Sequence, residues 1–456
     1  MSKLTTQELG SKPIGNLLIK QAVPASIGIL VMSINLLVDT IFVGNWIGSI
    51  AIAAINVVTP VSFFIAALGM AIGIGGSSII SRALGADNDE KAFKTFGNQI
   101  TITILLTICL VIFGLAFVNL LIPAFGGRGE IFEPAKIYYT IILYGVPLLA
   151  LCMMGNSVIR AEGKPKFAMI AMIIPSVGNL LLDFILIKVF DMGMAGAAWA
   201  STGSYILCLS FIIWFFKSRN AELKISFAHL GIDFTLLKEI SSLGFVTLSR
   251  QAVVSVTYLL VNNTLFELGG ETSVTSYAII ARMLMFALFP VLGMTQGFLP
   301  VAGFNYGAEK YDRVRTSINK AVIYAGVVAV FVFSLIMIFP QAIVSVFTDN
   351  PEVMKKTPSA MRWVFAALPI IGLQTIGSAY FQAIGKAVPA LLLTLSRQGF
   401  FFIPLVLILP QYFGIIGVWV AFPLADLLST VVTGYFLNRE IKATLVNPNQ
   451  VNLSDR

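Results

Sequence analysis

Charged and metal-binding residues are scarce in this chain. Only 11% of its 456 residues are charged, whereas about a quarter are charged in a typical soluble protein. It has one histidine, His229, and three cysteines. The cysteines lie inside apolar runs at spacings that match no zinc or disulfide framework, so we expect Cys109, Cys152 and Cys208 to be small buried hydrophobic residues. Without a cluster of metal ligands or a Ser–His pair, an enzyme is not indicated, and we expect no cofactor.

Apolar residues are abundant instead. They make up 57% of the sequence, and the mean hydropathy is +0.89. Runs of about 20 mostly apolar residues recur, which is the length that a helix needs to cross a membrane with its backbone hydrogen bonds satisfied. The first run begins near Ile14, is longer than the apolar core of a signal peptide and has no cleavage site after it, so we expect it in the mature protein. The formal net charge of +8 lies in short loops, which indicates membrane topology rather than a nucleic-acid partner.

Hydropathy over windows of about 20 residues predicts an all-α integral membrane protein with twelve transmembrane helices. The first six are expected near residues 16–43, 52–80, 96–122, 136–158, 167–188 and 193–216, and the second six near 238–266, 272–302, 317–341, 358–381, 388–410 and 414–437. A polar stretch that holds His229 separates the two sets. We therefore expect an N-lobe at 1–216, a cytoplasmic linker at 217–237 and a C-lobe at 238–456 with a cytoplasmic C-terminal tail.

The two halves of the sequence resemble each other weakly. Three pairs of landmarks recur at a shift of 222 or 221 residues: Gly85-Ala86 and Gly307-Ala308, Gly163-Lys164 and Gly385-Lys386, and Gly193 with Gly196 and Gly414 with Gly417. Internal repeats of this kind are common in transporters. Because each half has an even number of spans, both enter the membrane from the same side. The pseudo-twofold axis that relates the two six-helix lobes is therefore expected to lie along the membrane normal.

Basic residues in the loops predict the orientation, because cytoplasmic loops carry an excess of Lys and Arg. With the N-terminus inside, the inner segments hold about 20 of these residues. The outer loops hold only Arg128, Lys136, Lys188, Lys355 and Lys356. We therefore expect a monomeric multi-pass protein of the inner (plasma) membrane with both termini in the cytoplasm.

Acids inside the apolar runs mark a candidate ion site, because a charge in hydrocarbon costs roughly 2.5–3.5 kcal/mol or more. Asp39 lies deep in the first predicted helix, and Asp183 lies in the fifth on the same helical face as Asn179. If these helices pack together, two carboxylates and one amide meet in a dry cavity. Oxygen ligands suit a hard cation such as Na⁺, and two close carboxylates also favour binding of a proton. The alternative is that the acids only fix helix packing.

The apolar runs of the second half contain one acid, Asp426, and three arginines, Arg250, Arg282 and Arg397. We expect Asp426 to form a structural ion pair with one of these arginines. Acids are otherwise scarce in this half, so we expect some of the arginines to line a water-filled cavity.

Two further features concern helix geometry. Pro24 lies on the same predicted helix as Asp39, where it removes a backbone hydrogen bond and predicts a kink. Ion binding at Asp39 could bend the helix at this kink, or the kink could be static. The stretch Gly69-Met-Ala-Ile-Gly73-Ile-Gly-Gly76 follows no strand, so we expect helix packing through small residues rather than a dinucleotide-binding loop.

Short motifs accompany several helices of both halves. In the first half they are Val38-Asp39-Thr-Ile-Phe-Val-Gly44, Ser81-Arg82-Ala-Leu-Gly85-Ala86, Arg160-Ala-Glu-Gly163, and Asn179 with Asp183. In the second half they are Gln296-Gly297-Phe-Leu-Pro300, Asn305-Tyr306-Gly307-Ala308 and Gln382-Ala-Ile-Gly385-Lys386. Together they resemble the signatures of the multidrug and toxic compound extrusion (MATE) family over residues 15–440. The resemblance implies a two-lobed, V-shaped exporter of amphipathic, often cationic, drugs that is driven by inward H⁺ or Na⁺.

The resemblance also implies roles for individual residues. It assigns ion coupling to Asp39, Asn179, Asp183 and a hydroxyl on helix six, Ser201, and it assigns helix bending to Pro24. Family members with a C-lobe sodium site carry acids on helices seven and ten, and this chain has none there at mid-membrane. Coupling is therefore expected in the N-lobe, as in the prokaryotic branch with an acid on helix one. For the substrate cavity we expect Met32, Asn35, Asn156, Met172, Arg250, Gln251 and Met285.

Two functions are compatible with these features. The first is multidrug efflux by antiport, with H⁺, Na⁺ or both as the coupling ion. The second is a flippase for lipid-linked oligosaccharides, a class that resembles MATE exporters in fold. A flippase would need a cationic cavity for a pyrophosphate, which Arg250, Arg282 and Arg397 would supply. A membrane-embedded enzyme is disfavoured because the only histidine, His229, lies in the linker.

Overall fold

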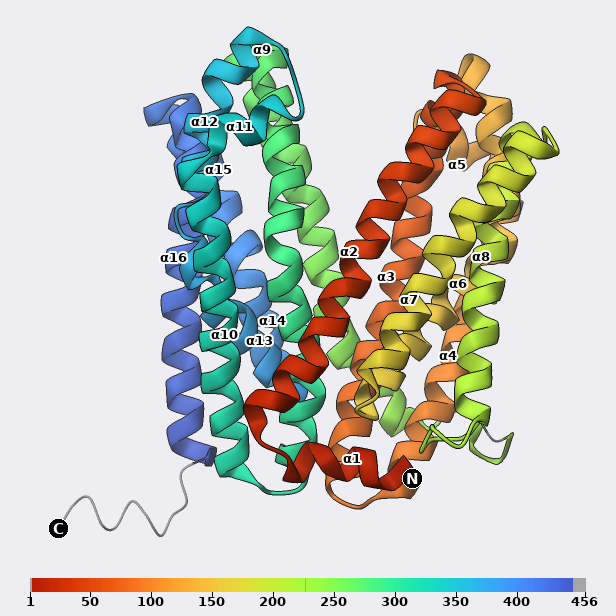
Figure 1. The fold of residues 1–456 in the computed structure, drawn as a ribbon, viewed down its shortest axis with the longest axis vertical. Coiled ribbons are helices and arrows are strands. Elements are labelled where there is room, and N and C mark those ends of the chain that lie inside the picture. Colours follow the sequence, from red (N-terminus) through yellow and green to blue (C-terminus); the bar gives the residue numbers. More distant parts are fainter. Residues whose placement is uncertain (1, 226, 446–456) are drawn as a thin grey trace. The chain divides into compact units, whose positions relative to one another are not determined.

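The computed structural model describes residues 2–225 and 227–445, and within them it contains helices and no strand (Figure 1). Eleven segments are long and apolar enough to cross a membrane. They are α2 (Ile14–Trp46), α3 (Ser49–Gly85), α4 (Asp89–Ala116), η1 with α6 (Gly129–Ala161), α7 with the π-helical turn η2 (Pro165–Val189), α8 (Gly193–Lys217), α9 (Phe234–Gly307), α10 (Tyr311–Ile338), α12 to α13 (Pro351–Ala383), α14 to α15 (Ala387–Phe413) and α16 with η6 (Ile415–Leu445). The shorter helices are α1 (Ser2–Ser11), α5 (Val118–Ala124) and α11 (Pro340–Ser345).

Segment α9 consists of two membrane-spanning helices that meet at Gly270. This residue has φ 63° and ψ −162°, a conformation outside the helical region that glycine adopts without strain. The eleven segments therefore contain twelve membrane-spanning helices in the part of the chain that is described. The predicted number of helices and the predicted break between residues 266 and 272 are both confirmed.

Backbone conformations confirm the predicted repeat. Glycines with positive φ recur at the same shifts as the sequence landmarks: Gly48 (122°) and Gly270 (63°), Gly163 (72°) and Gly385 (86°), and Gly193 (53°) and Gly414 (55°). Two acidic residues with positive φ, Asp87 (53°) and Glu309 (56°), are related in the same way. Helices end at the same places in each half, so the weak sequence similarity reflects repeated local structure.

The chain packs into two units, and the long segments α2 and α9 each contribute to both. Unit 1 comprises α1 and Ile27–Thr247, and unit 2 comprises Lys12–Ser26 and the chain from Leu248 onward. The divisions in α2 and α9 fall at positions that the repeat makes equivalent. Pro24 lies just before the division in α2. The lobe and linker boundaries expected from the sequence stay a prediction.

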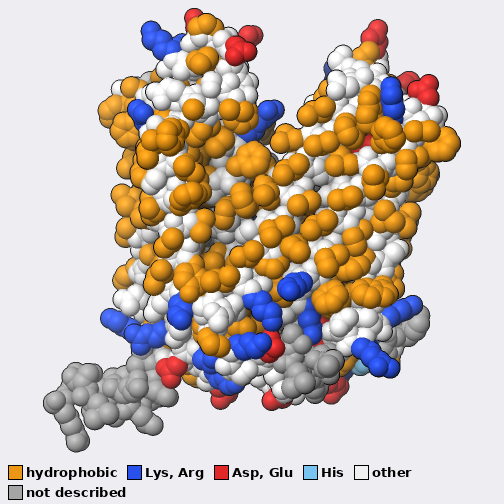
Figure 2. Space-filling view, viewed as in Figure 1, with side chains coloured by type: hydrophobic (Ala, Val, Ile, Leu, Met, Phe, Trp, Pro, Cys, Tyr) orange, Lys and Arg blue, Asp and Glu red, His pale blue; other side chains and the backbone are white. Residues whose placement is uncertain are grey.

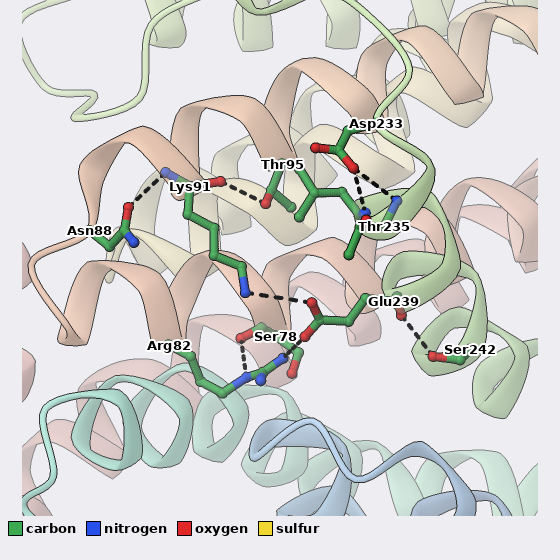
Figure 3. A network of polar contacts seen from close by, with 10 residues as sticks. Ser78, Arg82, Asn88, Lys91, Thr95, Asp233, Thr235, Glu239 and Ser242 are labelled. Atoms are coloured by element: carbon green, nitrogen blue, oxygen red, sulfur yellow. Dashed lines mark hydrogen bonds and ion pairs between the residues drawn. The ribbon is translucent and has the colours of Figure 1, made fainter.

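A polar network holds the first part of α9 on unit 1 (Figure 3). The carboxylate of Glu239 accepts a hydrogen bond from the Arg82 guanidinium, at the end of α3, over 2.8 Å. It also lies 3.6 Å from the Lys91 ammonium on α4. A Cβ on Gly75 of α3 would lie 2.3 Å from the carbonyl oxygen of Ile240, so only glycine permits this close approach of the two backbones. The start of α9 is therefore built into unit 1.

Helix packing through glycine is confirmed for the glycine-rich run of α3. A Cβ on Gly69 would lie 2.5 Å from the carbonyl oxygen of Ala150, and one on Gly73 would lie 2.9 Å from the Cα of Met154. Both contacts are made with α6, whose backbone approaches α3 closely because these positions lack side chains. This contact connects the two helices that form the centre of unit 1.

The turn between α6 and α7 is buried at one end of unit 1. The Glu162 carboxylate there is 0% exposed and accepts hydrogen bonds from the backbone N–H groups of Glu222 at 3.2 Å and Leu223 at 2.8 Å. The Thr6 hydroxyl of α1 lies within hydrogen-bonding distance of the Glu162 carbonyl oxygen and the Glu222 carboxylate. Burial raises the pKa of Glu162 to about 8, although the two backbone donors and Lys164 lower it. Glu162 therefore ties α1 and the 217–233 segment to the helices of unit 1.

The visible surface has the distribution of side chains expected for a membrane protein. Figure 2 shows hydrophobic side chains over the middle of each unit, with Lys and Arg concentrated toward the ends. Cys152 and Cys208 are buried as predicted, but the prediction is wrong for Cys109, which is exposed on α4. It lies among exposed apolar side chains such as Ile108 and Ile112. In a membrane such a surface contacts lipid, so lipid rather than protein covers Cys109.

Candidate ion-coupling site

Helices α2 and α7 bring two acids and two amides together in unit 1. Asn35 and Asp39 lie one turn apart on α2, and Asn179 and Asp183 lie one turn apart on α7. Asn35 Nδ2 donates a hydrogen bond to Asn179 Oδ1 at 2.8 Å. The carboxyl groups of Asp39 and Asp183 are in side-chain contact. The acids and the amide singled out on the first and fifth helices therefore lie together, and Asn35 joins them.

The two helices contact each other in a constant register. The members of the amide pair and of the acid pair differ by 144 in residue number, and so do Gly28 and Met172. A Cβ on Gly28 would lie 2.6 Å from Met172 Sδ. A constant difference means that α2 and α7 run in the same direction with their turns matched. A shift of one helix along the other would therefore separate the acids and the amides at the same time.

Asp183 is buried without a hydrogen-bond donor. It is 0% exposed, and neither of its carboxylate oxygens has a donor among the described residues. Within the same set of residues, Asn179 Nδ2 is buried without an acceptor. Buried polar atoms nearly always have partners, and two carboxylates in contact repel each other unless a proton or cation neutralises one of them. The acid pair therefore has the chemistry of a binding site for H⁺ or a small hard cation.

Tyr138 of α6 links this site to Ser201 of α8. Its hydroxyl lies near the Ser201 side chain and close enough to Asp39 and Asp183 to interact electrostatically with both. Ser201 thus connects to the acids through Tyr138. Tyr138 could not be predicted from the sequence, because the adjacent Tyr139 lies in the same apolar run and is an equally good candidate. Only the packing of α6 distinguishes the two.

Further oxygen atoms lie beside the acid pair. Asn179 Oδ1 accepts the hydrogen bond from Asn35, and the Tyr138 hydroxyl lies close to both acids. Oxygen ligands suit a hard cation such as Na⁺, and two carboxylates in contact also favour binding of a proton. The residues present therefore suit either ion.

Both helices of the site have an irregularity in their backbone. Pro24 lies inside α2, on the same helix as Asp39, and cannot donate a backbone hydrogen bond. On α7 the regular helix ends at Asp183, and Phe184–Val189 continue as a π-helical turn. Such turns are frequent at functional sites because the wider ladder of hydrogen bonds redirects the side chains. Each acid therefore lies on a helix whose backbone departs from regular α-helical hydrogen bonding.

A second polar cluster of unit 1 surrounds Arg160. Its Nε donates to Asn156 Oδ1 at 3.0 Å, and one terminal nitrogen contacts Met172 Sδ at 3.1 Å. Asn156 Nδ2 donates to the carbonyl oxygen of Ala168 at 2.6 Å. The proposed cavity residues Asn156 and Met172 are thus engaged in holding a buried arginine, whereas Met32 is exposed on α2.

The remaining predicted residues belong to unit 2. Arg250 is half-buried on α9, and Gln251 and Met285 are exposed on the same segment. The ion pair predicted for Asp426 is confirmed: Arg397 Nε donates to Asp426 Oδ1 at 2.6 Å.

Comparison with known proteins identifies the family. The MatE family model matches residues 24–185 and 247–408. The chain is similar to the multidrug export protein MepA of Staphylococcus haemolyticus (strain JCSC1435), with 26% identity over 398 residues that cover 87% of each chain. It is equally similar to MepA of Staphylococcus aureus (strain NCTC 8325 / PS 47), with 26% identity over 407 residues that cover 89% of each chain.

Solved structures of transporters superpose on nearly the whole chain. The outward-facing conformation of a multidrug resistance MATE family transporter of the MOP superfamily gives a TM-score of 0.90 at 26% identity, over 97% of this chain and 99% of that one. A MATE described in the bent conformation gives a TM-score of 0.91 at 27% identity over 96% and 98%. One described in the straight conformation gives 0.90 at 26% identity over 96% and 98%. Because the family model matches both halves of the repeat, this chain belongs to the MATE (multidrug and toxic compound extrusion) family of membrane transporters.

Proposed function

We propose that this protein exports amphipathic, often cationic, organic compounds by antiport against H⁺ or Na⁺. The observation that carries the proposal is the contact of Asp39 with Asp183 inside membrane-spanning helices, where Asp183 has no donor among the described residues. An ion or proton is the natural partner of such a pair. The similar staphylococcal proteins are named multidrug export proteins, which supports drug-like compounds as the exported cargo.

Coupling requires that the ion and the exported compound favour different conformations of unit 1. When a proton or Na⁺ neutralises the acids, Asp39 and Asp183 remain in contact and α2 stays on α7. When the ion leaves, two like charges repel in a medium of low dielectric constant and push the helices apart. The compound would bind the separated form, so that entry of the ion releases it.

Pro24 gives α2 a place to bend during this change. The division of α2 falls between Ser26 and Ile27, two residues beyond the proline. A bend there would move the part of α2 that carries Asp39 while the preceding part keeps its packing in unit 2. Related MATE structures have been described in bent and straight conformations, which supports a flexible element in this family.

The expected setting is the plasma (inner) membrane of the cell, with the protein acting as a monomer. The excess of Lys and Arg in the segments on the N-terminal side supports a cytoplasmic location for both termini. Export from the cytoplasm would then use the inward gradient of the coupling ion.

Efflux from proteoliposomes tests the proposed function. Liposomes that contain purified protein are loaded with a fluorescent organic cation, and a pH gradient and a Na⁺ gradient are imposed separately. Efflux that follows one of the gradients supports antiport and identifies the ion. Asp39→Asn and Asp183→Asn are expected to abolish it, whereas Glu271→Gln, which neutralises an exposed acid on α9, should not. An efflux rate that changes with neither gradient would overturn the proposal.

A flippase for lipid-linked oligosaccharides is the second candidate. It is favoured by Arg250, which has no charged partner among the described residues of unit 2 and would suit a pyrophosphate. Transfer of a fluorescent polyprenyl pyrophosphate between the leaflets of the same liposomes, without efflux of the organic cation, would support it.

A further inference from the structure

The membrane-spanning helices of unit 2 carry positive charge that its own acids do not neutralise. Arg250 and Arg282 lie on the two helices of α9, and Arg397 lies in the π-helical turn η5 (Ser396–Phe402). Among the described residues, Asp426 is the only acid of unit 2 that lies away from the end of a membrane-spanning helix. A charge inside hydrocarbon is costly unless it is paired or faces water. One acid cannot pair with all three arginines, so any partner of the other two has to come from elsewhere.

Asp426 is already committed to Arg397. Arg397 Nε donates to Asp426 Oδ1 at 2.6 Å, and both side chains are largely buried. Phe422, one turn before Asp426 on α16, packs on Phe402 of η5 with ring centroids 4.4 Å apart. The pair is therefore largely buried and is neutral as a unit, so it offers Arg250 no negative charge.

Arg250 stands near the middle of a membrane-spanning helix without a partner. It lies about 24 Å along α9 from Phe234, and Gly270 ends the helix about 30 Å away on the other side. The side chain is half-buried, and no charged or hydrogen-bonding group among the described residues acts on it. Val253, one turn further along α9, packs on Gly399 of η5. The segment that carries the neutral ion pair thus passes beside Arg250, and it brings no free acid.

The side of α9 that carries Arg250 lies opposite its exposed apolar side. Leu259 is 65% exposed and, nine residues after Arg250, lies half a turn around the helix from it. The exposed apolar residues Val256 and Phe266 lie on the same side as Leu259. Exposed apolar residues thus occupy one side of α9, and Arg250 projects from the opposite one. A long side chain at mid-helix on that side cannot reach the lipid headgroups.

A polar stripe runs along α9 between these two sides. It consists of residues at helical spacing, of which the first three are exposed and the last is half-buried: Gln251, Ser255, Tyr258 and Asn262. Polar side chains at membrane depth line water or a ligand rather than lipid. Tyr258 also pairs with Tyr277, with ring centroids 5.8 Å apart, and so provides aromatic surface two turns from the guanidinium.

We propose that Arg250 binds an anionic group, such as a carboxylate, sulfonate or phosphate, on the amphipathic aromatic compounds that this protein exports. A guanidinium provides two parallel N–H donors that match the oxygens of these groups. The ligand would supply the negative charge that unit 2 lacks beside Arg250, and its aromatic part would lie along the polar stripe toward Tyr258. The inference rests on the proposed export function and extends its substrates to zwitterions and amphipathic anions.

Two dyes that differ in one charge test this assignment. Rhodamine 110 carries a carboxylate, and rhodamine 123 is its methyl ester, so the chromophore and the positive charge are shared. Binding of each dye to the purified full-length protein is measured by fluorescence anisotropy without any ion gradient. Arg250→Gln should weaken binding of rhodamine 110 about tenfold or more and leave rhodamine 123 unchanged. The affinity of Arg250→Lys for rhodamine 110 should lie between those of wild type and Arg250→Gln, because an ammonium keeps the positive charge but lacks the two parallel N–H donors.

Matched controls separate this effect from general damage. Lys355→Gln removes one positive charge from an exposed position on α12 and should leave both dyes unaffected. Equal weakening of the two dyes in Arg250→Gln, or unchanged binding of rhodamine 110, would overturn the inference. Farnesyl diphosphate, added as a competitor, distinguishes the source of the anion. Displacement that depends on Arg250 assigns the site to a lipid phosphate, and absence of displacement assigns it to the anionic group of a drug-like compound.

Failure of the export function would be visible separately. If wild-type protein binds rhodamine 110 through Arg250 but moves neither dye under a pH or Na⁺ gradient, the proposed antiport is wrong while the assignment of Arg250 stands. If it moves rhodamine 123 but Arg250→Gln moves rhodamine 110 equally well, antiport stands and the assignment of Arg250 is wrong.

Discussion

Asp39 and Asp183 lie in side-chain contact one helical turn beyond the hydrogen bond that joins Asn35 to Asn179. The amide pair holds α2 against α7 in the register that brings the acids together. The same two helices thus carry two neighbouring contacts. The amide pair is stabilising, and the acid pair is repulsive when both acids are charged. Binding of a proton or cation removes the repulsion, and its departure restores it. The contact between α2 and α7 is therefore sensitive to the ion.

Replacing either acid by asparagine should abolish ion-coupled efflux. Asp39→Asn and Asp183→Asn preserve side-chain size but remove the charge that binds the ion. The rate of dye efflux should therefore drop about tenfold or more, toward that of liposomes without protein. Because asparagine also removes the repulsion, both variants should unfold at the same temperature as wild type or above it. The measurements are dye efflux from proteoliposomes and thermal unfolding in detergent. Wild-type efflux by either variant would contradict the assignment.

Pro24→Ala should slow transport without weakening ligand binding. Alanine supplies the backbone N–H that α2 lacks at this position, and a proline in a helix interior costs roughly 3 kcal/mol. The variant should therefore unfold at a higher temperature and bend less readily beside the division at Ser26. Pro60→Ala is the matched control, because Pro60 lies inside α3, a helix wholly within unit 1. Equal slowing by both substitutions would show that Pro24 has no special role as a hinge.

The helices and the repeat could be predicted because they are encoded locally. An apolar run of sufficient length specifies a membrane-spanning helix, and residues such as Gly163 and Gly385 mark places where the backbone must adopt positive φ. The division of α2 and α9 between the two units could not be predicted in this way. Hydropathy runs without interruption through Ser26 and Thr247. Membership of a unit depends instead on contacts between distant segments, such as the ion pair of Glu239.

The sequence predicted those residues of the site that are rare in membrane-spanning helices. A charge in an apolar run is unusual, so Asp39 and Asp183 stood out without any structure. Tyr138 did not stand out, because aromatic residues are common in apolar helices and only tertiary packing turns its hydroxyl toward the acids. The partner of Asp426 was equally undetermined. Several arginines were available to it in sequence, and the packing of η5 on α16 selects Arg397.

Breaking the Arg397–Asp426 pair from one side should destabilise the protein. Asp426→Asn leaves a largely buried guanidinium without its counter-charge, which costs about 3–5 kcal/mol. Replacing both partners by apolar residues, as in Arg397→Met with Asp426→Leu, should restore the unfolding temperature to near that of wild type. Thermal unfolding of the single and double variants in detergent provides the measurement. If the double variant lowers the unfolding temperature by as much as the two single variants combined, the two residues contribute to stability independently and not as a pair.

Glu162 should make stability depend on pH. Burial raises its pKa to about 8, against an ordinary value of 4.5, so the folded protein holds this proton more tightly than the unfolded chain does. The resulting stabilisation is fully present below the ordinary pKa and is lost as the pH rises through the raised one. For a group this deeply buried it is on the order of 5 kcal/mol. Glu162→Gln cannot ionise, so the fall in unfolding temperature between about pH 5 and pH 9 should be smaller in this variant than in wild type. Glu133→Gln, at an exposed position on α6, should keep the wild-type fall, and an unaltered fall in Glu162→Gln would assign the pH dependence to other groups.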